Sequence, residues 1–150
     1  VPEKRAELTT EGGLDVISNM KDIAKACDEL KKDNIEVSLF IDPDLKQIDA
    51  AKSCGAEVIE LHTGEYSEFA NDYRLRSHKN KSLHRIVEAV EYALGEGLIV
   101  NAGHGLNYHN VGEIARIKGI NELNIGHSII ARALMVGMKE AVRDMLVLIN

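Results

Sequence analysis

The sequence is poor in cysteine, proline and aromatic residues: its 150 residues include two cysteines, two prolines and no tryptophan. Cys27 and Cys54 stand alone within helix-like patterns, which excludes the disulfide framework of a small secreted domain and the paired spacing of a zinc site. Apolar runs near 18 residues are missing, as is a charged and then apolar leader. We therefore expect neither a membrane span nor export, and a cytoplasmic location.

A basic excess is also missing. Lysine and arginine number 18 against 24 aspartates and glutamates, for a net charge of −6, and the basic residues are scattered. This argues against nucleic acid as a partner, because nucleic-acid binders gather lysine and arginine on one surface. The length suits one domain with a sizeable core.

Helix and strand patterns alternate along the chain. Apolar residues step by three and four over 14–32, which predicts an amphipathic helix, and short β-rich segments follow at 36–42, 57–63, 98–103 and 121–126. Asp42, as the helix cap, and Pro43, in the first turn, indicate a helix start after the first of these strands. We interpret 67–82 as a polar loop, with a lid as an alternative, leading into a helix that Gly95 closes, and the segment up to Asn150 as helical.

Strands separated by helices run parallel, so the sequence predicts an α/β fold. Ligands of such folds bind at the carboxyl ends of the strands, whether the sheet is open or closed into a barrel. Four strand-helix units are half of an eightfold barrel, which takes about 250 residues. The polar residues expected at the carboxyl ends are Glu60, His62, Thr63, Asn101, His104, Asn124 and His127.

The glycines beside two of these histidines suggest an anion site. Gly103 and Gly105 flank His104, and Gly126 precedes His127, so the backbone can approach a ligand closely and adopt positive φ. Ser128 is expected to open a helix, whose first N–H groups suit a phosphate. The alternative is that both segments are merely tight turns. Histidines 78 and 84 are interpreted as surface residues, and His109 as flanking a helix.

Five stretches resemble pyridoxine 5′-phosphate synthase, in the right order and at the right spacing. They are VPEKRAELTTEGGLDV (1–16), VSLFID (37–42), IELHTGEY (59–66), NAGHGLNYHN (101–110) and ELNIGHSII (122–130). The resemblance implies a (β/α)8 TIM barrel, of which the chain supplies the C-terminal part of a single domain, with strands 5–8. It implies an enzyme that joins 1-deoxy-D-xylulose 5-phosphate to 3-amino-2-oxopropyl phosphate, forming pyridoxine 5′-phosphate, phosphate and water.

The resemblance also implies roles for single residues. His104 corresponds to the proton donor, and imidazole suits this role because it titrates near neutrality. Glu60 corresponds to a residue that stabilises charge in the transition state, although it could equally be half of a buried ion pair. Thr9 corresponds to a contact for the deoxyxylulose phosphate, with a helix cap as its other interpretation. The contacts implied for the amino-ketone phosphate are Gly105, Gly126 and His127.

Assembly and cofactors follow from the same resemblance, which implies a homo-octamer with neither metal nor organic cofactor. The general bases that the family places on its early strands have no counterpart here, so we expect the 150 residues alone to be inactive. Two alternatives stay open. Glu60, His62, His104 and His127 are residue types that could hold Zn²⁺ or Fe²⁺ in a barrel metallohydrolase, and a non-catalytic half-barrel could pair with another copy to bury its open sheet edges.

Overall fold

A four-stranded parallel sheet lies at the centre of the molecule. The computed structural model describes residues 12–70 and 72–150, and its strands are β1 (Ser38–Ile41), β2 (Val58–His62), β3 (Ile99–Gly103) and β4 (Ile120–Asn124). Their order in the sheet is the order in the sequence, and all three neighbouring pairs are parallel. The predicted α/β fold with parallel strands is thus confirmed, and all four strands lie within or close to their predicted ranges.

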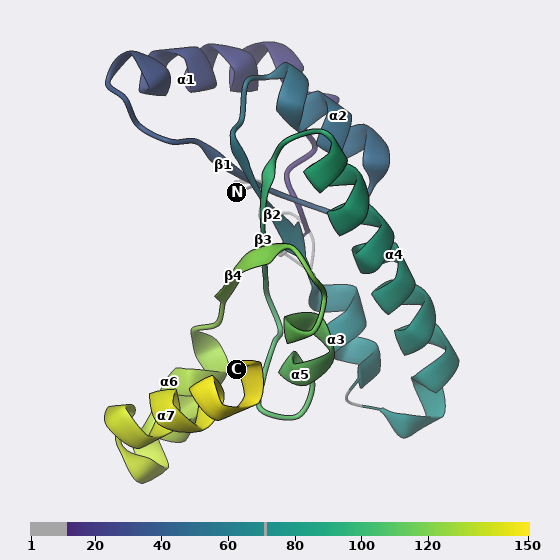
Figure 1. Ribbon diagram of the computed structural model, residues 1–150, viewed down its shortest axis with the longest axis vertical. Helices are drawn as coiled ribbons and strands as arrows, with labels where there is room; N and C mark the ends of the chain where they lie inside the picture. The colour runs from purple at the N-terminus through teal and green to yellow at the C-terminus, as the bar shows by residue number, and fades with distance from the viewer. Residues whose placement is uncertain (1–11, 71) are drawn as a thin grey trace.

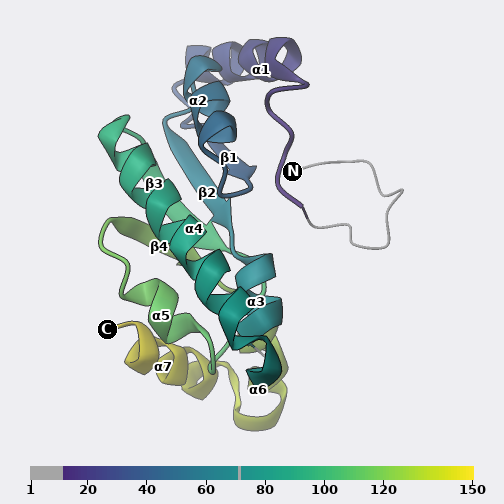
Figure 2. The ribbon, with the colours of Figure 1, turned by 90° about the vertical axis from the view of Figure 1, so that its right-hand side faces the viewer.

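Helices connect the strands and cover one face of the sheet. Figures 1 and 2 show α2, α3, α4 and α5 on the same side, with α1 at one end of the molecule and α6 and α7 at the other. Among the described residues, no helix is long and apolar enough to cross a membrane. The helices are α1 (Met20–Lys32), α2 (Leu45–Ser53), α3 (Gly64–Ala70), α4 (Arg76–Gly95), α5 (Val111–Ala115), α6 (His127–Val136) and α7 (Met138–Ile149), with a 3-10 turn at Tyr73–Leu75.

The two faces of the sheet differ in polarity. Side chains alternate between the faces along a strand, and the helix-covered face carries fully buried Ile41, Ile59 and Leu61. The register places Glu60 beside Asn101 and His62 beside Gly103 on the opposite face. One face therefore forms the core, while the other presents polar groups.

Two predicted boundaries were wrong. The segment 67–82 is not a loop, because α3 continues to Ala70 and α4 already begins at Arg76. Ser67 and Ser82 are buried within these helices, so short polar residues were mistaken for loop residues. The first helix begins at Met20 instead of residue 14, because the buried Val16 lies in a turn and its N–H donates to Gln47 Oε1 at 2.8 Å.

The start of α2 also differs from the prediction. Its N-cap is Asp44, whose carboxylate accepts hydrogen bonds from the N–H groups of Lys46 and Gln47 at 2.9 and 3.1 Å. Asp42, which the sequence suggested as the cap, contacts His62 across the sheet edge instead. Because Asp44 caps the helix, the carboxylate of Asp42 remains available for contacts at the carboxyl ends of the strands.

Tyr66 anchors α3 to α5 and provides a test of the packing. Its hydroxyl lies 2.7 Å from the carbonyl oxygen of Asn110 and 2.9 Å from Glu113 Oε2, and its side chain is fully buried. Burial is the main reason that the pKa of Tyr66 is raised, so the hydroxyl remains a donor. Tyr66→Phe should lower the free energy of unfolding in urea by about 1–3 kcal/mol, because a buried acceptor loses its partner.

The matched control is Tyr92→Phe. The Tyr92 hydroxyl donates to Asp49 at 2.6 Å in an exposed position, where water can replace it. We expect this variant to lose less than about 1 kcal/mol. Equal losses in the two variants would contradict the anchoring of α3 through Tyr66.

Candidate functional site

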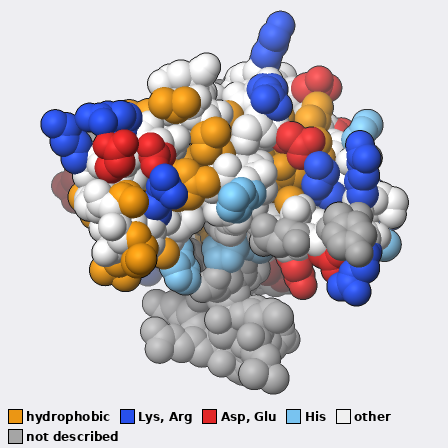
Figure 3. All heavy atoms as spheres, turned by 90° about the horizontal axis from the view of Figure 1, so that it is seen from below, with side chains coloured by type: hydrophobic (Ala, Val, Ile, Leu, Met, Phe, Trp, Pro, Cys, Tyr) orange, Lys and Arg blue, Asp and Glu red, His pale blue; other side chains and the backbone are white. Residues whose placement is uncertain are grey.

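The carboxyl ends of the four strands meet at one end of the molecule, close to α3 and α6. Figure 3 looks onto this end and shows histidine side chains near the middle of the face, with hydrophobic side chains on the side of α6 and α7. The register sets His62, Gly103 and Asn124 side by side as the last residues of three strands. The predicted gathering of polar strand ends is therefore present for β2, β3 and β4.

Glu60 lies on the polar face, one row before the strand ends. Its Oε2 accepts a hydrogen bond from Asn124 Nδ2 of β4 at 2.8 Å, across the intervening β3. A Cβ added to Gly103 would collide with the Glu60 carboxylate and lie 3.0 Å from the Asn124 Cβ. Gly103 is thus required because it leaves room for this carboxylate between strands β2 and β4.

His104 directly follows β3 and packs against His62. Their ring centroids are 4.8 Å apart with planes tilted by 36°, and the Phe40 ring of β1 stands edge-on to His62 at 5.2 Å. Nδ1 of His62 lies 3.3 Å from Oδ1 of Asp42. Three aromatic rings from the ends of three strands and one carboxylate therefore lie together. We call this group the imidazole cluster, and its members are Phe40, Asp42, His62 and His104.

The backbone of His104 has an unusual conformation, with φ of 80°. A positive φ in a residue other than glycine costs energy, and such residues occur most often at functional sites. The carbonyl oxygen of His104 accepts a hydrogen bond from Thr63 Oγ1 at 2.6 Å and lies 3.4 Å from Ser67 Oγ. These hydroxyls, from the end of β2 and from α3, hold the loop that presents the imidazole.

The loops after β3 and β4 lie against each other. Ser128 Oγ donates to the carbonyl oxygen of Leu106 at 2.9 Å, which joins the first turn of α6 to the loop containing Gly105. Gly126 is the N-cap of α6, and the exposed His127 is its first residue. The first N–H groups of an α-helix have no partner within the helix, so this turn offers donors to an anion.

Of the three glycines at this edge for which positive φ was predicted, two do not have it. Gly105 has the expected positive φ, at 76°. Gly126 has φ of −110°, and within residues 12–70 and 72–150 nothing lies within 4 Å of a Cβ added to it, so neither its conformation nor its packing against these residues requires glycine. Gly103 is absent from the positive-φ glycines among the described residues and instead makes room for Glu60. The helix starts one residue before Ser128.

Thr9, the remaining candidate, lies outside the described residues. Sequence reasoning missed Asp42, Phe40 and Gly64 as parts of the site. Asp42 was interpreted as a helix cap, although its position one residue after the last β1 residue, level with His62, was a usable signal. Phe40 and Gly64 carry no such signal, because their importance comes from side chains of neighbouring strands.

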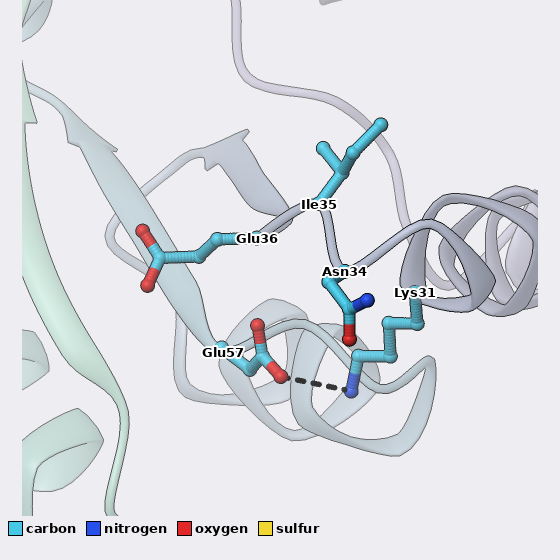
Figure 4. A pocket seen from close by; sticks show the side chains of 5 residues that line it. All are labelled: Lys31, Asn34, Ile35, Glu36 and Glu57. Atoms are coloured by element: carbon cyan, nitrogen blue, oxygen red, sulfur yellow. Dashed lines mark ion pairs between the residues drawn. The ribbon is translucent and has the colours of Figure 1, made fainter.

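Two further observations concern metal-ligating side chains and a pocket in another part of the molecule. In the part of the chain that the structure describes, no group of three histidine, cysteine, aspartate or glutamate side chains is arranged to hold a metal ion. A separate pocket lies at the amino ends of the strands and is lined by Lys31, Asn34, Ile35, Glu36 and Glu57 (Figure 4). Lys31 and Glu57 neutralise each other there at 3.4 Å. It contains none of the residues discussed above.

Comparison with known proteins gives a consistent result. The sequence model of the family described as "Pyridoxal phosphate biosynthesis protein PdxJ" matches residues 1–150. The chain is 58% identical over 149 residues to a pyridoxine 5′-phosphate synthase of Coxiella burnetii, covering 99% of this chain and 60% of the relative. Relatives of the same name from Alcanivorax borkumensis and Prochlorococcus marinus are 59% identical over 145 residues and 55% identical over 150 residues.

These relatives are longer than the chain. The match covers 97% of this chain and 58% of the Alcanivorax borkumensis protein, and 100% of this chain and 61% of the Prochlorococcus marinus protein. The chain thus spans about 60% of the length of the curated relatives that it matches.

Proposed function

Because the chain belongs to the family of the pyridoxal phosphate biosynthesis protein PdxJ, we propose that its complete protein is a pyridoxine 5′-phosphate synthase. The reaction condenses 3-amino-2-oxopropyl phosphate with 1-deoxy-D-xylulose 5-phosphate and releases phosphate and water with the product. The observation that carries the proposal is that Glu60 and His104 both lie at the carboxyl edge of the sheet, in a chain 55–59% identical to proteins of that name.

The roles proposed for the two residues follow from their chemistry. Imine formation between an amine and a carbonyl creates positive charge and requires proton donation as water leaves. Glu60 is a carboxylate held by the Asn124 amide, so it can balance that positive charge from a fixed position. His104 is the proton donor, since imidazole gives up and regains a proton near neutral pH.

The amino-ketone phosphate is assigned to the turn formed by Gly105, Gly126 and His127. The Ser128 to Leu106 hydrogen bond supports this assignment, because it holds the two loops close enough to share one anion. The exposed start of α6 supplies N–H donors and the positive end of a helix dipole. Thr9 is proposed as a contact for deoxyxylulose phosphate.

Proposals about the whole protein rest on the family. The four strands and their helices are assigned to the second half of a (β/α)8 barrel of one domain, with the polar face of the sheet as the barrel interior. A homo-octamer is proposed on the same basis. Cys27 and Cys54 are free and buried, which supports a reducing compartment, the cytoplasm.

The direct test is an assay of the complete natural protein with both substrates, with and without a chelator such as EDTA. We expect pyridoxine 5′-phosphate and inorganic phosphate to form at the same rate in both samples, and elemental analysis to show substoichiometric zinc and iron. The 150 residues alone remain predicted to be inactive. One tightly bound metal ion per chain, together with inhibition by EDTA, would favour the barrel metallohydrolase instead.

A further inference from the structure

His62 is the strand-end histidine to which the proposed reaction gives no role. It is nevertheless central to the imidazole cluster, where it contacts Asp42, Phe40 and His104. Its side chain is only 15% exposed, so it is not an ordinary surface residue. The question is what a second imidazole contributes beside the proposed proton donor.

Asp42 determines where His62 carries its proton. The hydrogen bond from His62 is the main reason that the pKa of Asp42 lies below its usual value, and the N–H of Gly13, at 3.0 Å, acts in the same direction. Partial burial of Asp42 acts against them. The carboxylate is therefore ionised at neutral pH and only accepts hydrogen bonds, so Nδ1 of His62 must be the donor.

In the neutral form of the ring, a proton on Nδ1 leaves Nε2 unprotonated. This atom is shielded from solvent and has no hydrogen-bond partner within residues 12–70 and 72–150. Buried polar atoms are nearly always paired, and a catalytic role is one of the explanations for an unpaired one. The position of Nε2 therefore calls for a functional explanation.

Gly64 shows where Nε2 lies relative to His104. A Cβ added to Gly64 would be 2.7 Å from both Nε2 and Cε1 of His62, and 3.0 Å from Cδ2 of His104. The edges of both rings thus border the Cα of Gly64 at the start of α3. Only glycine at this position allows the two imidazoles to meet.

We propose that His62 is a positioning residue for His104, with its tautomer fixed by Asp42. The His62 ring holds the His104 imidazole by stacking, and its unprotonated Nε2 leaves His104 as the proton donor of the pair. The inference deepens the proposed function and rests on it, because it takes His104 as the group that protonates the substrate.

The first experiment reads the tautomer directly by ¹⁵N NMR of the imidazole nitrogens in the complete natural protein. We expect Nδ1 of His62 to be protonated and Nε2 unprotonated in the wild type. In Asp42→Asn the new amide can donate to Nδ1 as well as accept from it, so the signals should shift towards the other tautomer. His84→Asn, a change at an exposed histidine of α4, is the control and should leave the His62 signals unchanged.

The second experiment measures steady-state kinetics of Asp42→Asn and His62→Phe. Phenylalanine keeps an aromatic ring against Phe40 and His104 but has no nitrogen to be oriented. Both variants should lower kcat by about 10- to 100-fold, because a misplaced reacting group costs up to about 10²-fold, with KM changed by less than about twofold. His84→Asn should keep the wild-type kcat.

Three outcomes would overturn the proposal. One is a wild-type His62 protonated on Nε2. Another is a folded His62→Phe with wild-type kcat, and a third is a loss in both variants that falls on KM alone. If His62→Phe does not fold, Asp42→Asn decides, because Asp42 is about half exposed and its replacement removes little packing. Failure of the proposed function is distinguished by the product assay. The wild-type protein would then make no pyridoxine 5′-phosphate although NMR still shows the Asp42-dependent tautomer of His62, and the role of His62 in proton donation would fail with it.

Discussion

Replacement of His104 by asparagine is expected to lower kcat by about 10²–10⁴-fold, while KM for both substrates changes little. Asparagine keeps roughly the size of the imidazole and one N–H donor but cannot release and regain a proton. It also tolerates the positive φ of 80° at this position better than most residues, so the loop after β3 should keep its shape. The measurement is steady-state kinetics of the complete natural protein.

His109→Asn serves as the control for this variant. His109 is exposed, and its backbone N–H, which the substitution retains, donates to Asn107 Oδ1 at 2.8 Å in the same loop. This variant should keep the wild-type kcat. Lost substrate binding with a normal rate at saturation would show instead that His104 is a ligand contact and not the proton donor.

Replacement of Gly126 by valine is expected to weaken binding of the amino-ketone phosphate by about 100-fold or more, the value of roughly two charge-assisted hydrogen bonds. The structure makes this substitution informative, because φ at Gly126 is −110° and, among the described residues, nothing lies within 4 Å of an added Cβ. The valine side chain therefore meets no described part of the fold, and we expect it to interfere with a ligand that approaches the start of α6. Calorimetric titration with each substrate separately measures the effect.

Gly95→Val is the matched control, since Gly95 also has nothing within 4 Å of an added Cβ in the part of the chain that the structure describes, but lies at the far end of α4. It should leave binding of both substrates unchanged. Binding of deoxyxylulose phosphate should be much less affected by Gly126→Val than binding of the amino-ketone phosphate. Equal losses for both, with circular dichroism showing an intact fold, would mean that the turn shapes the site in general and is not the phosphate cradle.

The alternation of helix and strand could be predicted because β1, β2 and β3 contain short apolar runs with glycine or proline nearby. Leu98 and Val100 of one such run are buried in the core, while Ile99 between them is 43% exposed on the opposite face of the sheet. The gathering of Glu60, His104 and Asn124 followed from the same pattern, since carboxyl ends of parallel strands share an edge. What failed was local: 67–82 has the composition of a loop, yet Ser67 and Ser82 are buried where α3 and α4 pack on each other.

The details of the site could not be predicted for a different physical reason. Three details of the site involve residues of neighbouring elements. They are the contact of Asp42 with His62, the room that Gly103 leaves for Glu60, and the space that Gly64 leaves for the two imidazole rings. These contacts depend on strand register, because a slip of one residue would move each side chain to the other face of the sheet. Sequence spacing alone does not set the register. Gly126 shows the opposite error: a glycine beside a histidine suggested positive φ, but the backbone there is ordinary.

The most direct test of the account is a crystal structure of the complete natural protein with a non-reacting analogue of the amino-ketone phosphate. The account predicts the phosphate within hydrogen-bond distance of backbone N–H groups at residues 126–128, with the analogue extending towards Glu60 and His104. An analogue bound at the amino ends of the strands, such as in the pocket beside Lys31 and Glu57 (Figure 4), would contradict it.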